Sequence, residues 1–245
     1  MFKTHIYFIV FLFSLATTNV FSQSIIDVDG NMYKTIKLGD QLWMTENLKT
    51  TRLNDSSSIQ NINDNTAWSN LKTAGFSLIN KQQHEAVYNG FAIQTNKLCP
   101  IGWHVPTDTE WSDLETFLIT QGYTDDASTK IVIDSSKYTR GYIPRINKIA
   151  KSMTVQNSTF TSQFDKKKHK KCGFAAVPTG FRLDSGQYTS IESLASWWSF
   201  NNNTLETNNN NGNWNRTIRF EDSNVERTLY NRNYGFSVRC MKTNN

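Results

Sequence analysis

The chain has 245 residues, and its 26 lysines and arginines against 21 aspartates and glutamates give a formal net charge of +5. The basic pI, about 9.0, owes much to one local run, KKKHKK at 166–171. A nucleic-acid-binding protein would have its basic residues spread along a groove with interleaved aromatic residues. The charge distribution therefore argues against nucleic acid as a partner, and the run is expected to lie in an exposed loop.

The first 22 residues have the layout of a secretory signal peptide. Lys3 gives a short basic start, residues 6–15 form an apolar run, and Ser22 is a small residue suited to signal peptidase. The apolar run is shorter than the roughly 20 residues that span a bilayer. We therefore expect cleavage before Gln23, leaving one domain over 23–245 that is extracytoplasmic (secreted, periplasmic or at the cell surface) and does not span a membrane.

Three cysteines remain in the mature chain: Cys99, Cys172 and Cys240. Cysteines of exported proteins tend to pair, and an odd number leaves one free or joined to another chain. Three pairings are possible, and counting cannot choose among them.

The N-terminal half begins with a predicted β-hairpin. Residues 25–48 alternate apolar and polar positions around an Asp-Gly and a Gly-Asp turn, which predicts paired strands at 32–38 and 41–44. Residues 54–65 are polar and rich in turn formers, so a loop is expected there. The pattern at 86–94 fits a short helix and a strand equally well.

The stretch LCPIGWHVPTDTEWSDLETFL at 98–118 combines residues typical of catalytic sites with the signals of a helix start. Thr107 followed by Glu110 fits a capping box, which predicts a helix beginning after Thr107. The apolar residues that follow fall on one helical face: Trp111, Leu114, Phe117 and Leu118. We therefore expect Trp103, Thr107, Glu110 and Trp111 to have structural roles.

The C-terminal half predicts strands separated by long loops. Residues 124–164 are polar and weakly patterned, with a short helix expected near 146–153. Residues 201–215 contain nine asparagines and predict a surface loop too polar to pack. Strand character appears in four segments: 172–183, 193–200, 214–220 and 234–242. The order of these elements predicts a single α+β domain with short antiparallel sheets, two or three helices and long loops.

Six segments then stand in a recognisable order: WMTENL (43–48), YNGFA (88–92), LCPIGWHVPTDTEW (98–111), GFAAVPTGFR (173–182), SWWS (196–199) and GFSVRC (235–240). Together they resemble the motifs of the Fibrobacter succinogenes major paralogous domain family of exported bacterial proteins, over roughly 26–242. A more distant similarity to formylglycine-generating and sulfatase-modifying proteins implies a C-type-lectin-like fold, which does not by itself fix a function.

The family resemblance also implies a Cys99–Cys240 disulfide, because both residues lie in the family's motifs. Cys172 occupies a position where the motif does not require cysteine, so it is expected to be a free thiol. Closing the long loop between Cys99 and Cys240 with a disulfide stabilises the fold by on the order of 4–5 kcal/mol in the chain-entropy model. With that bond formed, the reactive cysteine pair of formylglycine-generating chemistry is not expected.

The sequence does not predict a metal ion or other cofactor. The histidines of the mature chain, His84, His104 and His169, have no metal-ligand spacing. The Glu-Pro-Asn and Gln-Pro-Asp triplets of calcium-dependent lectins are absent, although the asparagine-rich loop and Glu221-Asp222 leave a weak calcium site as an alternative.

Two carboxylates, Glu46 and Glu110, are the candidates for a polysaccharide hydrolase, which would need them to converge in one cleft. Glu110 already has a role as a capping residue. No Gly-x-Ser-x-Gly elbow is present. A hydrolase therefore remains an alternative, as does a purely structural envelope protein.

Aromatic residues instead favour a non-enzymatic binding or adhesion module for polysaccharide or a cell-surface protein. The candidate ligand-binding residues are Trp197, Trp198, Trp214 and Tyr188, whose flat faces suit stacking on sugar rings. Alternation along a strand places Trp197 and Trp198 on opposite faces, so one of them is expected in the core and the other is free to be exposed.

Overall fold

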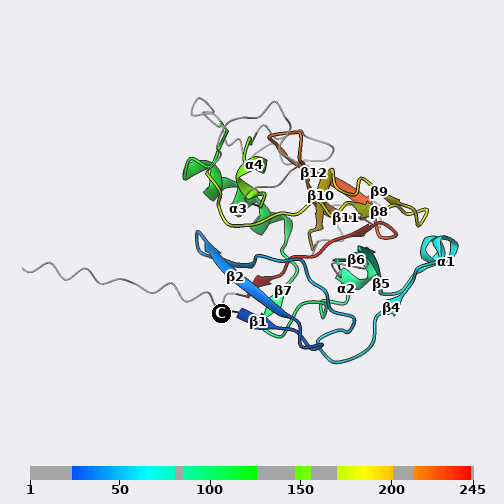
Figure 1. The fold of residues 1–245 in the computed structure, drawn as a ribbon. Helices are drawn as coiled ribbons and strands as arrows, with labels where there is room; N and C mark the ends of the chain where they lie inside the picture. Colours follow the sequence, from blue (N-terminus) through cyan, green and yellow to red (C-terminus); the bar gives the residue numbers. More distant parts are fainter. Residues whose placement is uncertain (1–23, 81–84, 126–146, 156–169, 201–211, 244–245) are drawn as a thin grey trace, which may run out of the picture.

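The N-terminal hairpin forms one side of a five-stranded sheet in the computed structural model, which describes residues 24–80, 85–125, 147–155, 170–200 and 212–243 (Figure 1). The strands, in their order across the sheet, are β1 (Ser24–Ile26), β2 (Met32–Leu38), β3 (Gln41–Met44), β14 (Met241–Lys242) and β7 (Trp103–His104). The hairpin has its predicted bounds, and Gly39 takes the left-handed conformation that its turn requires (φ 62°). The predicted signal peptide, residues 1–22, lies outside the described residues.

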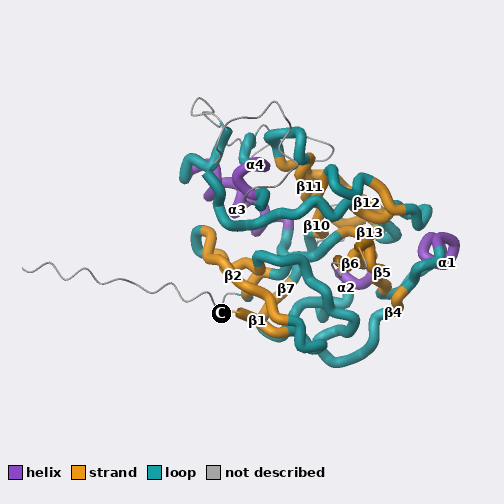
Figure 2. Tube along the Cα trace, in the orientation of Figure 1, coloured by secondary structure: helices purple, strands orange, loops and turns teal. Residues whose placement is uncertain are grey.

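A six-stranded sheet contains strands from both halves of the chain: β4 (Gln60–Asn61), β5 (Gly75–Asn80), β6 (Glu85–Asn89), β13 (Gly235–Phe236), β8 (Phe181–Arg182) and β9 (Tyr188–Thr189). The third sheet consists of β10 (Leu194–Trp198), β11 (Gly212–Arg219) and β12 (Val225–Asn231), all antiparallel. The tube in Figure 2 shows how much of the described chain is strand and loop and how little is helix. The predicted α+β class is thus confirmed, with β-structure predominating.

The described residues contain four helices, more than the two or three expected: α1 (Asn65–Asn70), α2 (Gly90–Gln94), α3 (Asp108–Thr120) and α4 (Ala150–Met153). The ambiguous stretch 86–94 contains most of a strand, β6, followed by a helix, α2. Asn89 caps α2 by accepting from the backbone N–H of Ala92. The helix predicted near 146–153 is present as α4, although residues 126–146 lie outside the description.

Helix α3 begins where the capping box predicts. Thr107 Oγ1 accepts from the Glu110 backbone N–H at 3.2 Å, and Glu110 Oε2 accepts from the Thr107 backbone N–H at 2.8 Å. Trp111, Leu114 and Leu118 are fully buried, while Phe117 on the same face is partly buried. The predicted capping box of Thr107 and Glu110 and the predicted core position of Trp111 are confirmed.

The prediction of a surface loop over 201–215 is wrong at its end. Residues 201–211 lie outside the description, but β11 starts at Gly212 and is the central strand of its sheet. Asn213 and Asn215 are fully buried. Their amides bond to other elements: Gln94 Nε2 donates to Asn213 Oδ1 at 2.9 Å, and Asn215 Nδ2 donates to Ser196 Oγ at 3.1 Å. These partners replace water for the Asn213 oxygen and the Asn215 amide, whereas Asn213 Nδ2 has no hydrogen-bond partner.

Two hydrophobic clusters fill the interior, one on each face of β10. Trp197 packs edge-on against Phe174, with ring centroids 5.4 Å apart, in a cluster that also contains Trp111. Trp198 lies in the other cluster, where its Nε1 donates to the Tyr88 carbonyl at 2.7 Å. The two tryptophans do lie on opposite faces, but both are fully buried. The expectation that one is exposed is wrong because both faces of β10 are covered.

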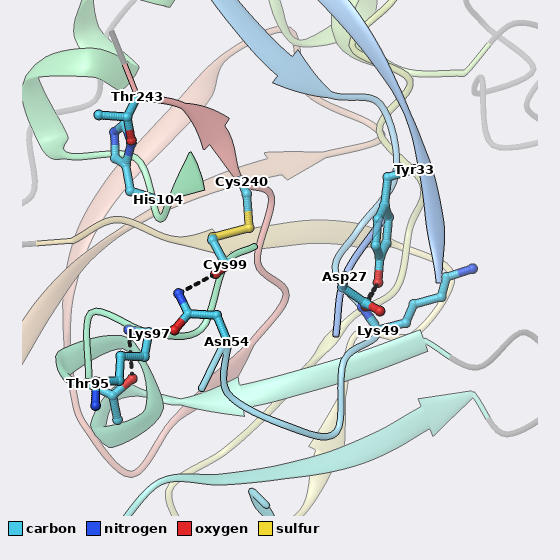
Figure 3. Close-up of a disulfide and its surroundings, with 10 residues drawn as sticks. All are labelled: Asp27, Tyr33, Lys49, Asn54, Thr95, Lys97, Cys99, His104, Cys240 and Thr243. Carbon is cyan, nitrogen blue, oxygen red and sulfur yellow. Dashed lines mark hydrogen bonds between the residues drawn. A yellow bond between two sulfur atoms is a disulfide. The ribbon is translucent and has the colours of Figure 1, made fainter. Parts of the chain in front are cut away.

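The disulfide joins Cys99 to Cys240 across a sequence separation of 141, as the family resemblance implied (Figure 3). It ties the segment before β7 to the segment before β14. Asn54 donates from Nδ2 to the Cys99 carbonyl at 3.0 Å and fixes a third segment to the same place. Cys172 is free and buried.

Among the described residues, no helix has the length and apolarity needed to cross a membrane.

Candidate functional site

A polar cavity of about 260 Å³ opens where the first and last segments of the domain meet. We call it the Arg239 pocket. Its lining residues are Lys34, Thr45, Glu46, Asn47, Lys49, Glu85, Val155, Ala175, Val177 and Arg239. Eight of them come from the WMTENL, GFAAVPTGFR and GFSVRC segments and from the strands β2 and β6, while Lys49 follows WMTENL and Val155 follows α4. The pocket is therefore built by parts of the chain that are far apart in sequence.

Backbone pairing explains why these segments meet. The Met44 N–H donates to the Cys240 carbonyl at 3.0 Å, and the Leu48 N–H donates to the Val238 carbonyl at 2.8 Å. Residues 44–48 thus lie along the last segment of the domain, which the disulfide at Cys240 also anchors. This register places Asn47 beside Arg239.

Arg239 is the central residue of the pocket. Its side chain is fully buried, and the guanidinium lies over the Phe174 ring, 4.3 Å from the centroid. Nη1 donates to the Phe174 carbonyl and Nη2 donates to Asn47 Oδ1 at 3.0 Å, whereas Nε has no hydrogen-bond partner. Burial lowers the pKa of Arg239 to about 9, so the group stays charged at neutral pH.

No carboxylate pairs with this buried charge within the described part of the chain. Glu85 and Glu46 raise the pKa of Arg239 through space, but neither forms an ion pair with it. A buried charge without a partner is costly. Arg239 is therefore a cation with incomplete hydrogen bonding that lies in the wall of the cavity but has no accessible surface.

Asn47 connects the pocket to the core. Its Oδ1 accepts from Trp197 Nε1 at 2.9 Å as well as from Arg239. Its Nδ2 donates to Glu85 Oε2 at 3.2 Å and lies 3.4 Å from Ser237 Oγ. The amide uses both its oxygen and its nitrogen, and so fixes the positions of Arg239 and Glu85 relative to each other.

Two lysines and a second carboxyl group complete the polar lining. Lys34 is exposed on β2, and Lys49 is partly buried. Glu46 Oε2 accepts from the Lys34 backbone N–H at 2.9 Å. Ala175, also in the lining, takes a left-handed backbone conformation (φ 57°), which is uncommon for a residue with a Cβ. Cations, carboxyl groups and one amide together provide donors and acceptors for a polar ligand.

The structure does not bring the two carboxylates of the hydrolase alternative together. Glu46 lines the Arg239 pocket, whereas Glu110 does not. Glu110 is turned back onto the start of its own helix, and both of its oxygens lie 2.9 Å from His104 Nε2. Burial alone would raise the pKa of Glu110, but the hydrogen bonds from His104 and Thr107 outweigh burial and lower it.

The predicted ligand-binding aromatic residues lie elsewhere. Trp197 and Trp198 are buried, as described above. Trp214 is 7% exposed, and the Arg227 guanidinium covers its ring at 3.4 Å from the centroid. Tyr188 is partly buried, with the Arg182 guanidinium 4.9 Å from its ring centroid. None of these four side chains lines the Arg239 pocket.

The remaining predicted positions have ordinary structural partners. Trp103, expected to be structural, is partly buried and packs against the second cluster. His104 contacts Thr243 Oγ1 through Nδ1 at 3.0 Å (the pair is drawn in Figure 3), while His84 and His169 lie outside the described residues. Asp222, one of the residues considered for a weak calcium site, accepts hydrogen bonds from the Ser223 and Asn224 backbone N–H groups.

No group of three or more histidines, cysteines or acidic residues that could hold a metal ion occurs in the described ranges. Of the basic run 166–171, only Lys170 and Lys171 are described. Lys170 is exposed, whereas Lys171 donates to the Lys151 carbonyl at 2.8 Å. The expected exposure of the run is thus confirmed for Lys170, whereas Lys171 is partly buried and hydrogen-bonded.

Sequence reasoning missed Arg239, Asn47 and Glu85 as pocket residues. The sequence did indicate that Arg239 is unusual, because this charged residue lies between Val238 and Cys240 in a segment predicted to be a strand. A buried charge of this kind is costly, so its position in the sequence was a reason to examine its surroundings. No comparable signal marks Asn47 or Glu85, because their roles depend on contacts with distant segments.

These features define the class of protein: a disulfide-bonded α+β domain with a charged pocket at the junction of its first and last segments. The Fibrobacter succinogenes major domain model matches residues 36–242. The chain belongs to that family. No match was found among curated proteins or among solved structures.

Proposed function

We propose that this chain is an exported, non-enzymatic binding module that takes a polar group of a polysaccharide into the Arg239 pocket. One observation carries the proposal: a cavity of about 260 Å³ is lined by two lysines, Lys34 and Lys49, and two carboxyl groups, Glu46 and Glu85, with the buried charge of Arg239 in its wall. A polar ligand that offers acceptors to the lysines and donors to the carboxyl groups would form charge-assisted hydrogen bonds there. Binding sites typically combine such a cavity with a few placed polar groups.

The proposed location is extracytoplasmic, either secreted or at the cell surface. Support comes from the signal-peptide layout of residues 1–22 and from the Cys99–Cys240 disulfide, a bond that persists in oxidising compartments. Amino-terminal sequencing of the protein from the culture medium and cell envelope tests this. A mature chain starting at Gln23 in either fraction is the expected result.

We also propose that the domain is a variant of the C-type-lectin-like fold. The support is the combination of a disulfide near the C-terminus, a hairpin at the N-terminus that pairs with the last strand, and short sheets joined by long loops. Superposition of an experimental structure on known lectin-like domains tests this proposal. A different order of strands across the common core would contradict it.

The binding proposal is tested with purified 23–245 on a panel of soluble glycans and insoluble polysaccharides, with and without calcium. The test variant is a Lys34→Gln, Lys49→Gln double substitution at the pocket. The control is Lys37→Gln, because Lys37 is an exposed lysine on the same strand that does not line the pocket. Selective binding that the double variant loses and the control retains is expected.

Two other outcomes are informative. Binding that both variants retain would place the ligand away from the Arg239 pocket. The absence of binding to any carbohydrate would overturn the polysaccharide proposal and favour a cell-surface protein as the partner. Loss of binding after calcium chelation would point to a calcium-dependent site.

A further inference from the structure

We propose that Gln23 is a modification site: once the signal peptide is removed, it closes on itself to form an N-terminal pyroglutamate lactam, which protects strand β1 from aminopeptidases. The inference rests on the export proposed above, specifically on cleavage before Gln23. Gln23 lies outside the described residues, and the described chain begins with Ser24, the first residue of β1.

The chemistry needs only the atoms of Gln23. Cleavage leaves an α-amino group and a side-chain carboxamide on the same residue. The uncharged amine, present in part at neutral pH, attacks the carboxamide carbon Cδ. A bond forms between the α-nitrogen and Cδ, the bond between Cδ and Nε2 breaks, and Nε2 takes up the proton lost by the amine and leaves as ammonia. Nothing is oxidised or reduced, and a glutaminyl cyclase would accelerate the same step.

Glutamine is the residue type suited to this reaction. Its carboxamide closes an unstrained five-membered ring, whereas asparagine at the same position would have to close a strained four-membered ring. Glutamate would have to expel water, which is a slower reaction. The lactam removes the positive charge of the terminus, as other covalent blocks of the amino group do.

The position of β1 gives the modification a consequence for the fold. Ser24 pairs with Lys34, and β1 is the edge strand of its sheet. Ile25, the next residue, packs against the second hydrophobic cluster. A chain terminus resists proteolysis when it is tied into a sheet, but here no spare residue separates Gln23 from the paired strand. Stepwise trimming would therefore remove strand pairs at once, and the lactam withholds the free amine that aminopeptidases require.

The residues that follow β1 connect it to the Arg239 pocket. Asp27 Oδ2 accepts from the Tyr33 hydroxyl at 2.6 Å, and the Tyr33 oxygen accepts from the Lys49 backbone N–H at 2.9 Å (Figure 3). Lys49 is one of the residues that line the pocket. Trimming through β1 to Asp27 would remove the hydrogen-bond acceptor of Tyr33 and loosen this part of the lining.

The first test is the mass of the protein exported by its source organism with its own signal peptide. We expect residues 23–245 with a mass lower by one ammonia than that calculated for the disulfide-bonded chain, and a terminal peptide that carries the same difference. A pyroglutamyl peptidase should then leave a chain that begins at Ser24. The Gln23→Ala variant should keep its calculated mass. Ser24→Ala is the control, and it should still form the lactam because Ser24 takes no part in ring closure.

The second test is incubation of the folded proteins with an aminopeptidase. The unmodified protein should stay intact and keep its Tm. The Gln23→Ala variant should lose residues from β1, and its Tm should then fall by at least about 2–4 °C, the shift that a small loss of stability produces in a domain of this size. Before incubation the two proteins should have the same Tm, because the Gln23 side chain lies outside the paired strand.

Three results would overturn the inference, and they differ in what they leave standing. An exported chain that begins at Gln23 with a free amine would exclude the lactam while the proposed export stands. A chain that retains residues 1–22 or begins at another residue would overturn the cleavage and this inference together. A lactam-bearing protein trimmed as fast as Gln23→Ala would exclude the protective role. The polysaccharide-binding measurements do not bear on any of these outcomes.

Discussion

Trp197 and Arg239 donate to the same atom: the indole Nε1 and the guanidinium Nη2 lie 2.9 and 3.0 Å from Asn47 Oδ1. All three side chains are buried. Asn47 is separated from its two partners by 150 and 192 residues along the chain. One amide oxygen therefore joins the aromatic core, the pocket and the final segment of the domain.

Replacing Asn47 by leucine should destabilise the protein strongly. The substitution leaves the Trp197 and Arg239 donors without their shared acceptor in a buried place. Each orphaned buried donor costs about 1–3 kcal/mol, and a charged donor costs more. We expect a loss of about 3 kcal/mol or more in the free energy of unfolding, measured by urea denaturation. The control is Asn70→Ala, since Asn70 is exposed; an equal effect of both changes would contradict the role given to Asn47.

The disulfide should contribute more to stability than any single hydrogen bond. It closes a loop with a sequence separation of 141. In the chain-entropy model, cross-linking the ends of a loop of this length stabilises the fold by on the order of 5 kcal/mol. A Cys99→Ser, Cys240→Ser double variant should lower the urea midpoint accordingly, and adding reductant to it should have no further effect.

Cys172→Ala is the matched control for this prediction. Cys172 is a buried free thiol, and burial raises its pKa, so it is neutral at pH 7 and serves as a small apolar group. The substitution should cost about 1 kcal/mol. A larger loss from Cys172→Ala than from the double serine variant would contradict the assignment.

The sequence allowed accurate prediction of those elements whose signals are local. The hairpin of β2 and β3 depends on alternation and a glycine turn, and the start of α3 depends on Thr107 and Glu110, three residues apart. Both predictions are confirmed. The Cys99–Cys240 bond followed from the family resemblance, because counting cysteines left three pairings open.

Buried polar residues were not predictable in this way. Asn213 looked like part of a surface loop, yet Gln94 bonds to it from another element and makes its burial possible. One of Trp197 and Trp198 looked free to be exposed, because alternation describes the two faces of a strand but not what covers them. The pocket has the same origin: Asn47, Glu85 and Arg239 come together only through tertiary contacts.

Acid should lower the free energy of unfolding, partly through protonation of Asp108, the first residue of α3. Burial alone would raise the pKa of Asp108, but the hydrogen bonds and charges of Arg227 and Arg216 outweigh burial and lower it to about 2 from 3.8. Because the folded pKa is below the unfolded value, this contribution is complete above the unfolded pKa and is lost as pH falls from about 4 to 2. It amounts to about 2 kcal/mol.

Urea denaturation at pH 7 down to pH 2 measures this contribution. The Asp108→Asn variant should lose stability at pH 7 and show a shallower decline between pH 4 and 2 than the unmodified protein. Asp113→Asn is the control, because Asp113 is exposed on the same helix. A pH dependence of Asp108→Asn identical to that of the unmodified protein would exclude Asp108 as a source of the acid sensitivity.

Gly180, in the GFAAVPTGFR segment, should not tolerate alanine. Its φ of 71° is in the left-handed region, and an added Cβ would lie 2.6 Å from the Thr189 carbonyl oxygen and 2.7 Å from the Ile191 nitrogen. Left-handed backbone costs a residue with a Cβ about 1–2 kcal/mol, and the backbone clash adds to this. Gly30→Ala separates the two effects, because Gly30 has a φ of 86° and nothing within 4 Å of an added Cβ. We expect Gly30→Ala to cost about 1–2 kcal/mol in urea denaturation and Gly180→Ala to cost clearly more; equal losses would mean that the chain around Thr189 and Ile191 adjusts freely.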